Sequence, residues 1–556
     1  MKKKLLPALI VTGLIILVVI IMGITALINK YTPTKKTEDL KEYFNISSDD
    51  EAALIVDNEL SDYKAKIIDK KIYVDYKFVH DSLNSRFYWD ANENVLLYTT
   101  ASDIISAAAD SNSYSVTKQT NDFGYPIVKA TSDSALIALD YVKQYSNITF
   151  KSYDDPARIV ITSKWDEIDS ATVSKSTQVR VKGGIKSPIL KEVKKDDKIT
   201  LLDSGDKWDK VATEDGVIGY IKSKALSESK KTKLTNPDYE EETFTHIKKD
   251  KDICLAWNQV TSQSANSKVP QVISSTKGIN VMSPTWFYLN DNNGNLADIA
   301  SKDYVSYCHS QGIEVWGLFS NFENTDVDAA YVLTHTSTRT TLINQIMSAA
   351  FNYELDGVNI DFENITEAAY GDSYIEFIRE LAIKCHNNGI SLSVDVTVPA
   401  SFNKFFNRSD MANFADYIVI MGYDEHYKGS DAGSVSSIPW VTEGVESTLK
   451  EVPADQIILG MPFYTRIWEL TPKEDDDAVT DTEDQSKYTV ASQVYSMDAA
   501  AAQLATNNAT AALDEESGQN YAEWSVSNKL YKVWLEDTTS LEKRLKLPYS
   551  GIKRHA

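Results

Sequence analysis

The feature that most constrains the fold is the alternation of strand-like and helix-like segments after residue 245. Seven short apolar runs are predicted to be strands: 253–257, 278–282, 313–319, 355–363, 392–398, 417–423 and 457–463. Helical stretches lie between them, among them 301–311, 337–353 and 374–388. This alternation is typical of a parallel α/β barrel, so residues 246–556 are predicted to form a domain of that class.

The run 355–363 is predicted to be a buried strand, because it is rich in apolar and β-favouring residues and contains no proline. Side chains alternate along a strand, so Asn359, Asp361 and Glu363 share one face, about 6.8 Å apart at each step. Carboxylates buried in series are costly unless they are hydrogen-bonded or used in chemistry. The alternative, a solvated edge strand, explains the apolar face poorly.

The same run resembles the DxxDxDxE signature of glycoside hydrolase family 18. Asp356, Asp361 and Glu363 match the signature, and Asn359 stands where an aspartate is usual. Asp356 is predicted to face away from the side of the strand that carries Asn359, Asp361 and Glu363, and it is therefore given a structural role.

Other segments extend the resemblance over about 250–547. Residues 421–424, Met-Gly-Tyr-Asp, are similar to the family's sixth-strand motif, and residues 460–466, Gly-Met-Pro-Phe-Tyr-Thr-Arg, to its seventh. Through residues 283–287 and 423–426, the chain is similar to bacterial spore-cortex and cell-wall N-acetylglucosaminidases.

The resemblance implies a substrate-assisted mechanism, in which the acetamido group of the sugar is the nucleophile. Glu363 would protonate the glycosidic oxygen and later activate water. Asp361 would hold the acetamido N–H and stabilise the positive oxazolinium. Tyr423, together with Asp424, would fix the acetamido carbonyl for attack.

Polar and aromatic residues gather at the predicted carboxyl ends of the strands, where barrel enzymes hold their substrates. The candidates for substrate binding are Asn359, Asp424, Met421, Trp286, Tyr464, Arg466 and Trp257. An amide at Asn359 can donate to the Asp361 carboxylate without taking its proton, so Asp361 is expected to stay ionised and to raise the pKa of Glu363. The mechanism needs no metal and no cofactor.

Two functions fit these residues. The first is a glycosidase that hydrolyses β-1,4 bonds of an N-acetylglucosamine-containing glycan with retention, with peptidoglycan favoured over chitin. The second is an inactive or weakly active glycan-binding protein on the same fold. Retention of Glu363 favours the enzyme.

The end of the chain favours the binding protein. Residues 540–547 resemble the helix that feeds an eighth strand, but residues 548–556 form a basic, non-strand tail. The (β/α)8-type TIM barrel is therefore expected to lack its last strand and to be truncated at its C-terminus, which would leave two strand edges unpaired.

The N-terminus predicts a membrane anchor. Three lysines precede an uncharged apolar run from residue 5 to residue 28, long enough for a transmembrane helix. Residues 1–28 are thus predicted to be a single-pass anchor, followed by a tether over 29–40. The basic flank places the N-terminus in the cytoplasm and the catalytic domain outside the cell membrane.

Two small domains are predicted between the tether and the barrel. Residues 41–167 contain an α+β repeat that resembles the copper amine oxidase N-terminal domain, without His or Cys clusters that would bind copper. Residues 170–226 consist of short β-like runs that resemble a bacterial SH3 domain, and residues 227–245 are predicted to be a linker.

Composition excludes some functions. The net charge of −23 argues against a nucleic-acid partner. The three cysteines lie in apolar stretches and fit neither a disulfide framework nor a zinc site.

Overall fold

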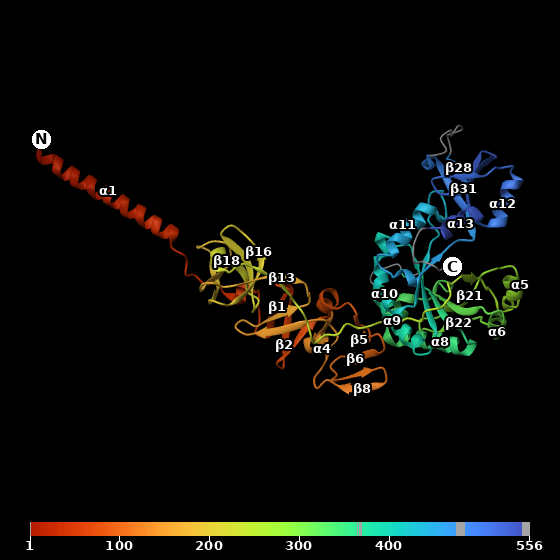
Figure 1. The fold of residues 1–556 in the computed structure, drawn as a ribbon, viewed down its shortest axis with the longest axis horizontal. Helices are drawn as coiled ribbons and strands as arrows, with labels where there is room; N and C mark the ends of the chain where they lie inside the picture. Colours follow the sequence, from red (N-terminus) through yellow and green to blue (C-terminus); the bar gives the residue numbers. More distant parts are fainter. Residues whose placement is uncertain (1, 364, 366–369, 474–483, 548–556) are drawn as a thin grey trace. The chain divides into compact units, whose positions relative to one another are not determined.

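The computed structural model describes residues 2–363, 365, 370–473 and 484–547. The chain divides into two compact units (Figure 1). The first comprises residues 1–89, 107–114 and 120–241, and the second comprises residues 90–106, 115–119 and 242–556. The second unit therefore contains the predicted barrel and two short upstream pieces.

The first unit begins with one long helix, α1 (Lys2–Tyr31). Its residues Leu9–Tyr31 have a mean hydropathy of 2.9 and are exposed. Because a bilayer core needs about 20 apolar residues, this helix is long and apolar enough to be either a membrane anchor or a signal sequence.

The element order strand, helix, strand, strand occurs twice in the region where an internal repeat is predicted. The first copy is β3 (Lys71–Asp75), α3 (Tyr76–Phe78), β4 (Phe87–Asp90) and β5 (Val95–Thr99). The second is β10 (Ala135–Ala138), α4 (Leu139–Gln144), β11 (Thr149–Tyr153) and β12 (Arg158–Thr162). The leading strands of the two copies, β3 and β10, pair antiparallel.

A second sheet of the first unit is antiparallel and follows the order β15-β14-β18-β17-β16-β13-β19. Its strands are β13 (Glu167–Thr172), β14 (Thr177–Arg180), β15 (Ile189–Val193), β16 (Lys198–Asp203), β17 (Trp208–Thr213), β18 (Ile218–Lys222) and β19 (Lys230–Lys233). The prediction of a linker over 227–245 is wrong at β19. That strand is lysine-rich and exposed because it lies at a sheet edge, where charges prevent pairing with other chains.

The second unit is built on seven parallel strands in the order in which they occur along the chain. They are β20 (Leu255–Asn258), β21 (Val281–Leu289), β23 (Glu314–Ser320), β24 (Gly357–Asp361), β25 (Ser391–Thr397), β26 (Tyr417–Met421) and β27 (Ile457–Gly460). Each of the seven predicted runs contains or overlaps one of them, which confirms the TIM-barrel type of fold.

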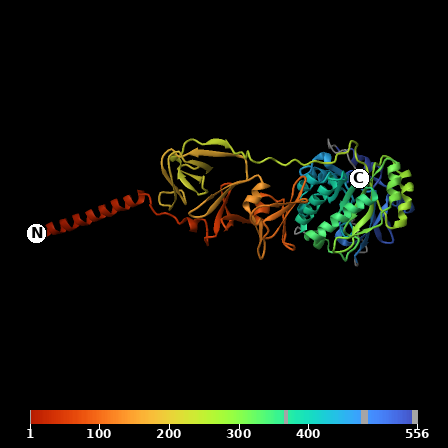
Figure 2. The same cartoon turned by 90° about the horizontal axis from the view of Figure 1, so that it is seen from below.

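The predicted helices are confirmed as α6 (Lys302–Ser310), α8 (Thr336–Tyr353) and α9 (Gly371–His386). They lie on the outside of the strands, in green to teal in Figure 2. Their apolar faces pack with Val358, Ile360 and Phe362 of the β24 segment in one buried core. This packing directs the other face of β24 to the inside of the barrel.

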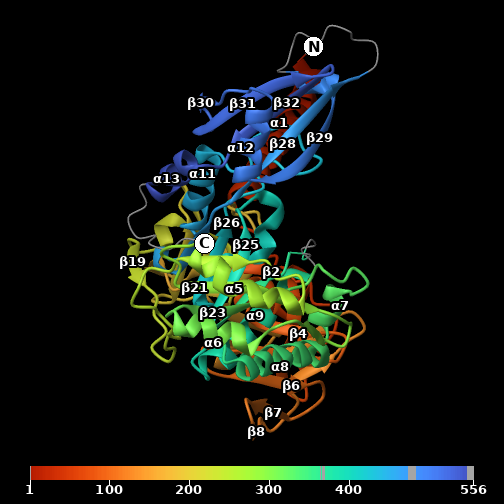
Figure 3. The same cartoon turned by 90° about the vertical axis from the view of Figure 1, so that its right-hand side faces the viewer.

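A five-stranded antiparallel sheet follows β27 and forms a layer of its own (Figure 3). It consists of β28 (Tyr464–Pro472), β29 (Tyr488–Ser496), β30 (Ala512–Asp514), β31 (Gln519–Val526) and β32 (Lys529–Leu535). Helix α12 (Met497–Thr506) lies within this insertion, and α13 (Thr538–Leu545) follows it.

Helix α13 confirms the helix predicted over 540–547. The tail predicted over 548–556 lies outside the described residues. Within the part of the chain that the structure describes, β20 and β27 are the two ends of the parallel strand order.

Candidate active site

Asn359 lies at the centre of the polar face of β24 and is fully buried. Its Oδ1 accepts hydrogen bonds from Trp257 Nε1 at 3.0 Å and Ser283 Oγ at 3.1 Å. Its Nδ2 donates to Ser393 Oγ at 3.0 Å and to Asp395 Oδ1 at 2.7 Å. Because the Trp257 indole can only donate, the amide oxygen must face it, and the orientation of Asn359 is fixed.

This network corrects the expected role of Asn359. Its amide donates to Asp395 on the neighbouring strand β25, whereas a bond to Asp361 was expected. Trp257, predicted to bind the substrate, donates its indole N–H to Asn359 and helps to hold that residue.

Asp361 follows at the carboxyl end of β24, and only 9 % of its surface is exposed. Its Oδ1 has no hydrogen-bond partner among the described residues. Burial, followed by the charges of Glu363 and Glu323, raises the pKa of Asp361 to about 8. Burial thus opposes ionisation of Asp361, and the expectation that this carboxyl group stays ionised remains a prediction.

Asp395 is a buried carboxyl group that the sequence analysis did not select. It lies on β25 and is only 3 % exposed. Burial, followed by the charge of Asp361, raises the pKa of Asp395 well above its ordinary range. The signal that could have identified it is simple: Asp395 is the only charged residue in the apolar run 392–398.

Glu363 stands just beyond the end of β24 and is exposed. Its backbone N–H donates to Asn321 Oδ1 at 3.0 Å, which ties this position to the segment after β23. Partial burial, followed by the charges of Asp424 and Glu323, raises the pKa of Glu363. The direction agrees with the expectation, but the causes are burial and the charges of Asp424 and Glu323, whereas the charge of Asp361 was expected.

Glu323 is a further carboxylate of this site that the sequence analysis missed. The Ser320 hydroxyl contacts both of its carboxylate oxygens, at 2.6 and 2.7 Å. Ser320 is in turn the register partner of Asp361 across β23 and β24. Glu323 is therefore held beside the Asp361–Glu363 segment.

Tyr423 and Asp424 follow β26 after one intervening residue. Tyr423 is half-buried, its ring lies edge-on to Trp257, and burial raises its pKa. Tyr464 donates its hydroxyl to Asp424 Oδ1 at 2.7 Å, and Arg466 Nη2 lies 3.6 Å from the same oxygen. The predicted residues of the sixth and seventh motifs are thus brought together in one cluster.

A small cavity of about 160 Å3 lies beside Glu363. Asp395, Met421 and the exposed ring of Phe402 contribute to its lining. The predicted position of Met421 at the site is therefore consistent with the structure.

Trp286 does not belong to the site, and its prediction as a substrate-binding residue is wrong. It is fully buried, and its Nε1 donates to Asn266 Oδ1 at 2.8 Å. The reason is that β21 continues to Leu289, beyond the end predicted at residue 282, so Trp286 lies within the strand and packs on Tyr304 of α6.

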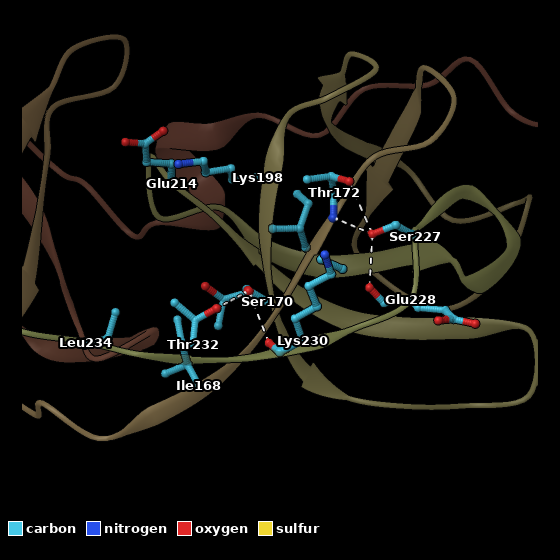
Figure 4. Close-up of a pocket in the computed structure, with 13 residues that line it drawn as sticks. Ile168, Ser170, Thr172, Lys198, Glu214, Ser227, Glu228, Lys230, Thr232 and Leu234 are labelled. Atoms are coloured by element: carbon cyan, nitrogen blue, oxygen red, sulfur yellow. Dashed lines mark hydrogen bonds between the residues drawn. The ribbon is translucent and has the colours of Figure 1, made fainter.

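A separate groove of about 730 Å3 lies within the first unit, along β13, β16 and β19 (Figure 4). Its apolar floor is flanked by charges of both signs, among them Lys198, Glu214, Glu228 and Lys230. The Ser227 hydroxyl lies at its edge, between the backbone N–H of Thr172 and the carbonyl of Glu228. Mixed charges over an apolar floor indicate no particular chemistry.

The second unit is similar to known proteins. Residues 317–549 match the family model described as "Glycosyl hydrolases family 18". An uncharacterized glycosylase of Bacillus subtilis is 25 % identical over 194 residues, covering 32 % of this chain and 55 % of that protein. A cortical fragment-lytic enzyme of the same organism is 23 % identical over 265 residues, covering 46 % and 58 %.

The chain thus spans about half the length of the curated relatives it matches. Among solved structures, a chitinase from Chromobacterium violaceum has a TM-score of 0.45 and 19 % identity. That likeness covers 52 % of this chain and 88 % of the other.

Proposed function

Because residues 317–549 match the family 18 model, we propose that the chain hydrolyses β-1,4 bonds of an N-acetylglucosamine-containing glycan by substrate-assisted, retaining catalysis. The proposal rests on the different environments of the two carboxyl groups of Asp361 and Glu363. One carboxyl group is buried with an oxygen that has no partner among the described residues, and the next lies exposed at the open end of the strand.

Glu363 is the general acid and base of this mechanism. Its raised pKa keeps the carboxyl group protonated at higher pH, which suits a residue that must deliver a proton to the glycosidic oxygen. Once the bond is broken, the resulting carboxylate takes a proton from water as it attacks the oxazolinium.

Asp361 and Tyr423 hold the acetamido group between them. The open Oδ1 of Asp361 accepts the acetamido N–H, and its charge stabilises the positive ring that forms. The hydroxyl of Tyr423 donates to the acetamido carbonyl and holds it for attack on the anomeric carbon. Tyr464 and Arg466 hold Asp424 at the rim of the same site.

The favoured substrate is peptidoglycan, and the favoured location is the outer face of the cell membrane. Helix α1 is long and apolar enough to anchor the protein in a bilayer, next to the wall. The basic residues Lys2, Lys3 and Lys4 favour a cytoplasmic N-terminus. A cortical fragment-lytic enzyme is among the relatives, which fits a wall glycan better than chitin.

Substrates without a 2-acetamido group are expected to resist cleavage. The oxygen that attacks the anomeric carbon belongs to the acetamido group, so a matched glucoside lacks the nucleophile. The measurement compares turnover of an N-acetylglucosamine oligomer and a glucose oligomer of equal length and linkage. A thiazoline mimic of the cyclised intermediate should inhibit the enzyme, and efficient cleavage of the glucoside would contradict substrate assistance.

Glu323→Gln is expected to move the alkaline limb of the pH–rate profile to lower pH. The charge of Glu323 raises the pKa of Glu363, and the reaction needs Glu363 protonated. Removing that charge lowers the pKa, so the protonated form is lost at a lower pH. The measurement is kcat/KM from pH 4 to pH 9, with the exposed Glu446 changed to glutamine as a control; an unchanged limb would exclude electrostatic action by Glu323.

A further inference from the structure

Asp361 and Asp395 occupy equivalent positions on neighbouring parallel strands. The register pairs Asn359 with Ser393 and Ile360 with Val394, so Asp361 and Asp395 come next on β24 and β25. Strands in a sheet lie about 4.8 Å apart, and residues of equal parity point to the same face. The two carboxyl groups are therefore neighbours inside the barrel.

The hydrogen bonds around Asn359 show which oxygen of Asp395 is used. The Trp257 indole fixes the amide of Asn359, and the amide N–H is directed at Asp395 Oδ1. The Trp257 indole also hydrogen-bonds to the Asp395 carboxyl group, and Asp361 is the neighbouring charge that acts most strongly on Asp395. A neutral carboxylic acid can accept the Asn359 N–H with one oxygen and donate its O–H to Asp361 with the other.

We propose that Asp395 is a positioning residue: a buried, neutral carboxylic acid whose O–H holds Asp361 as an oriented carboxylate towards the acetamido group of the substrate. This inference deepens the proposed function and rests on it. The carboxyl group that the family signature usually carries at the position of Asn359 is thus supplied here from the next strand. The proton stays on Asp395 through the reaction.

Electrostatics support this assignment. Two charged carboxylates side by side in a buried site repel each other, so one of them keeps a proton. In the described residues, neither Asp361 nor Asp395 forms an ion pair with a basic side chain that would allow both to ionise. Asp395 is the more buried of the two, and its pKa is raised well above the ordinary range, which makes it the member that keeps the proton.

The protonation of Asp395 can be tested without any turnover. Infrared difference spectra of Glu363→Gln and Glu363→Gln/Asp395→Asn at pH 7 compare two proteins that both lack the Glu363 carboxyl group. We expect the first to show the C=O band of a protonated carboxylic acid and the second to lack it. If both proteins show the same bands, Asp395 is ionised and the proposal is wrong.

The positioning role is tested by two variants of Asp395. In Asp395→Asn the amide still accepts from Asn359 and donates to Asp361, so kcat should stay within about 10-fold of wild type. In Asp395→Leu the donor is lost, and kcat should fall by about 100-fold or more with little change in KM, because the proposed role of residue 395 is to orient Asp361. Equal kcat for the two variants would overturn the role.

An exchange of the two side chains gives the sharpest result. Asn359→Asp places a second carboxyl group against Asp395 and should reduce kcat by about 100-fold. Asn359→Asp/Asp395→Asn restores one carboxylic acid beside Asp361, and most of the loss should be recovered. Additive losses in the double variant, with unchanged melting temperatures, would refute the proposal. Inactivity of the wild type on every acetamido glycan would instead refute the proposed function, while the infrared result would still stand.

Discussion

Glu363→Gln is expected to lower kcat by about 10³- to 10⁴-fold, with little change in the affinity for glycan. Glutamine has the shape of the protonated acid but cannot give up a proton, so the leaving oxygen departs as an alkoxide. Glu363 lies beyond the end of β24, and its backbone N–H donates to Asn321 after β23, so the side-chain change leaves that contact intact. The measurement is release of soluble fragments from purified wall glycan, followed by mass spectrometry.

The matched control is Glu446→Gln, the same chemical change on the exposed side of α11 (Ile438–Thr448). It should cleave at the wild-type rate. Binding of each variant to insoluble glycan separates the two functions that fit the sequence. Equal turnover by Glu363→Gln and the wild type would remove Glu363 from the mechanism, and binding without turnover in all three proteins would indicate a glycan-binding protein.

The barrel strands were predictable because each is an apolar run between helical stretches. The segment 355–363 shows how much of the site such a pattern can predict. Apolar and polar side chains alternate along this segment, which shows that the apolar ones face the helices. Asn359 and Asp361 could therefore be placed inside the barrel from the sequence alone. The same alternation could not show which residues of the neighbouring strands contact Asn359 and Asp361.

Asp395 was missed for this reason. It is 34 positions after Asp361 and approaches it only through the register of β24 and β25. Local periodicity contains no information on pairing between distant strands, which depends on how the whole barrel packs. The amide of Asn359 was accordingly assigned to Asp361, its neighbour along the strand, when its partner is across the sheet.

Trp286 and β19 show two opposite errors. Trp286 was placed at the barrel mouth because the strand was predicted to end early, whereas β21 continues and buries it. The residues Lys230–Lys233 were assigned to a linker because they are polar, whereas they form an edge strand on β13. Element boundaries and edge strands both depend on tertiary contacts that composition does not reveal.

Arg544→Met is expected to lower the free energy of unfolding of the second unit by about 3–5 kcal/mol. Arg544 on α13 and Glu536 after β32 form a two-bonded ion pair, at 2.6 and 2.8 Å, in which both side chains are fully buried. Removing the guanidinium leaves Glu536 buried without its counter-charge. Arg544 also donates to the carbonyl of Ser436, whose hydroxyl donates to the carbonyl of Gly422, next to Tyr423.

The variant should therefore lose catalytic rate as well as stability, because Ser436, which bonds the residue before Tyr423, loses its contact with Arg544. The measurements are thermal and urea unfolding of the full chain, together with kcat. Lys546→Met is the control, since Lys546 forms an exposed pair with Glu542 on the same helix and should change stability by less than about 1 kcal/mol. Glu536→Gln/Arg544→Met should recover part of the stability, because no buried charge remains. If Arg544→Met unfolds at the same temperature as Lys546→Met, the ion pair does not stabilise the packing of α13.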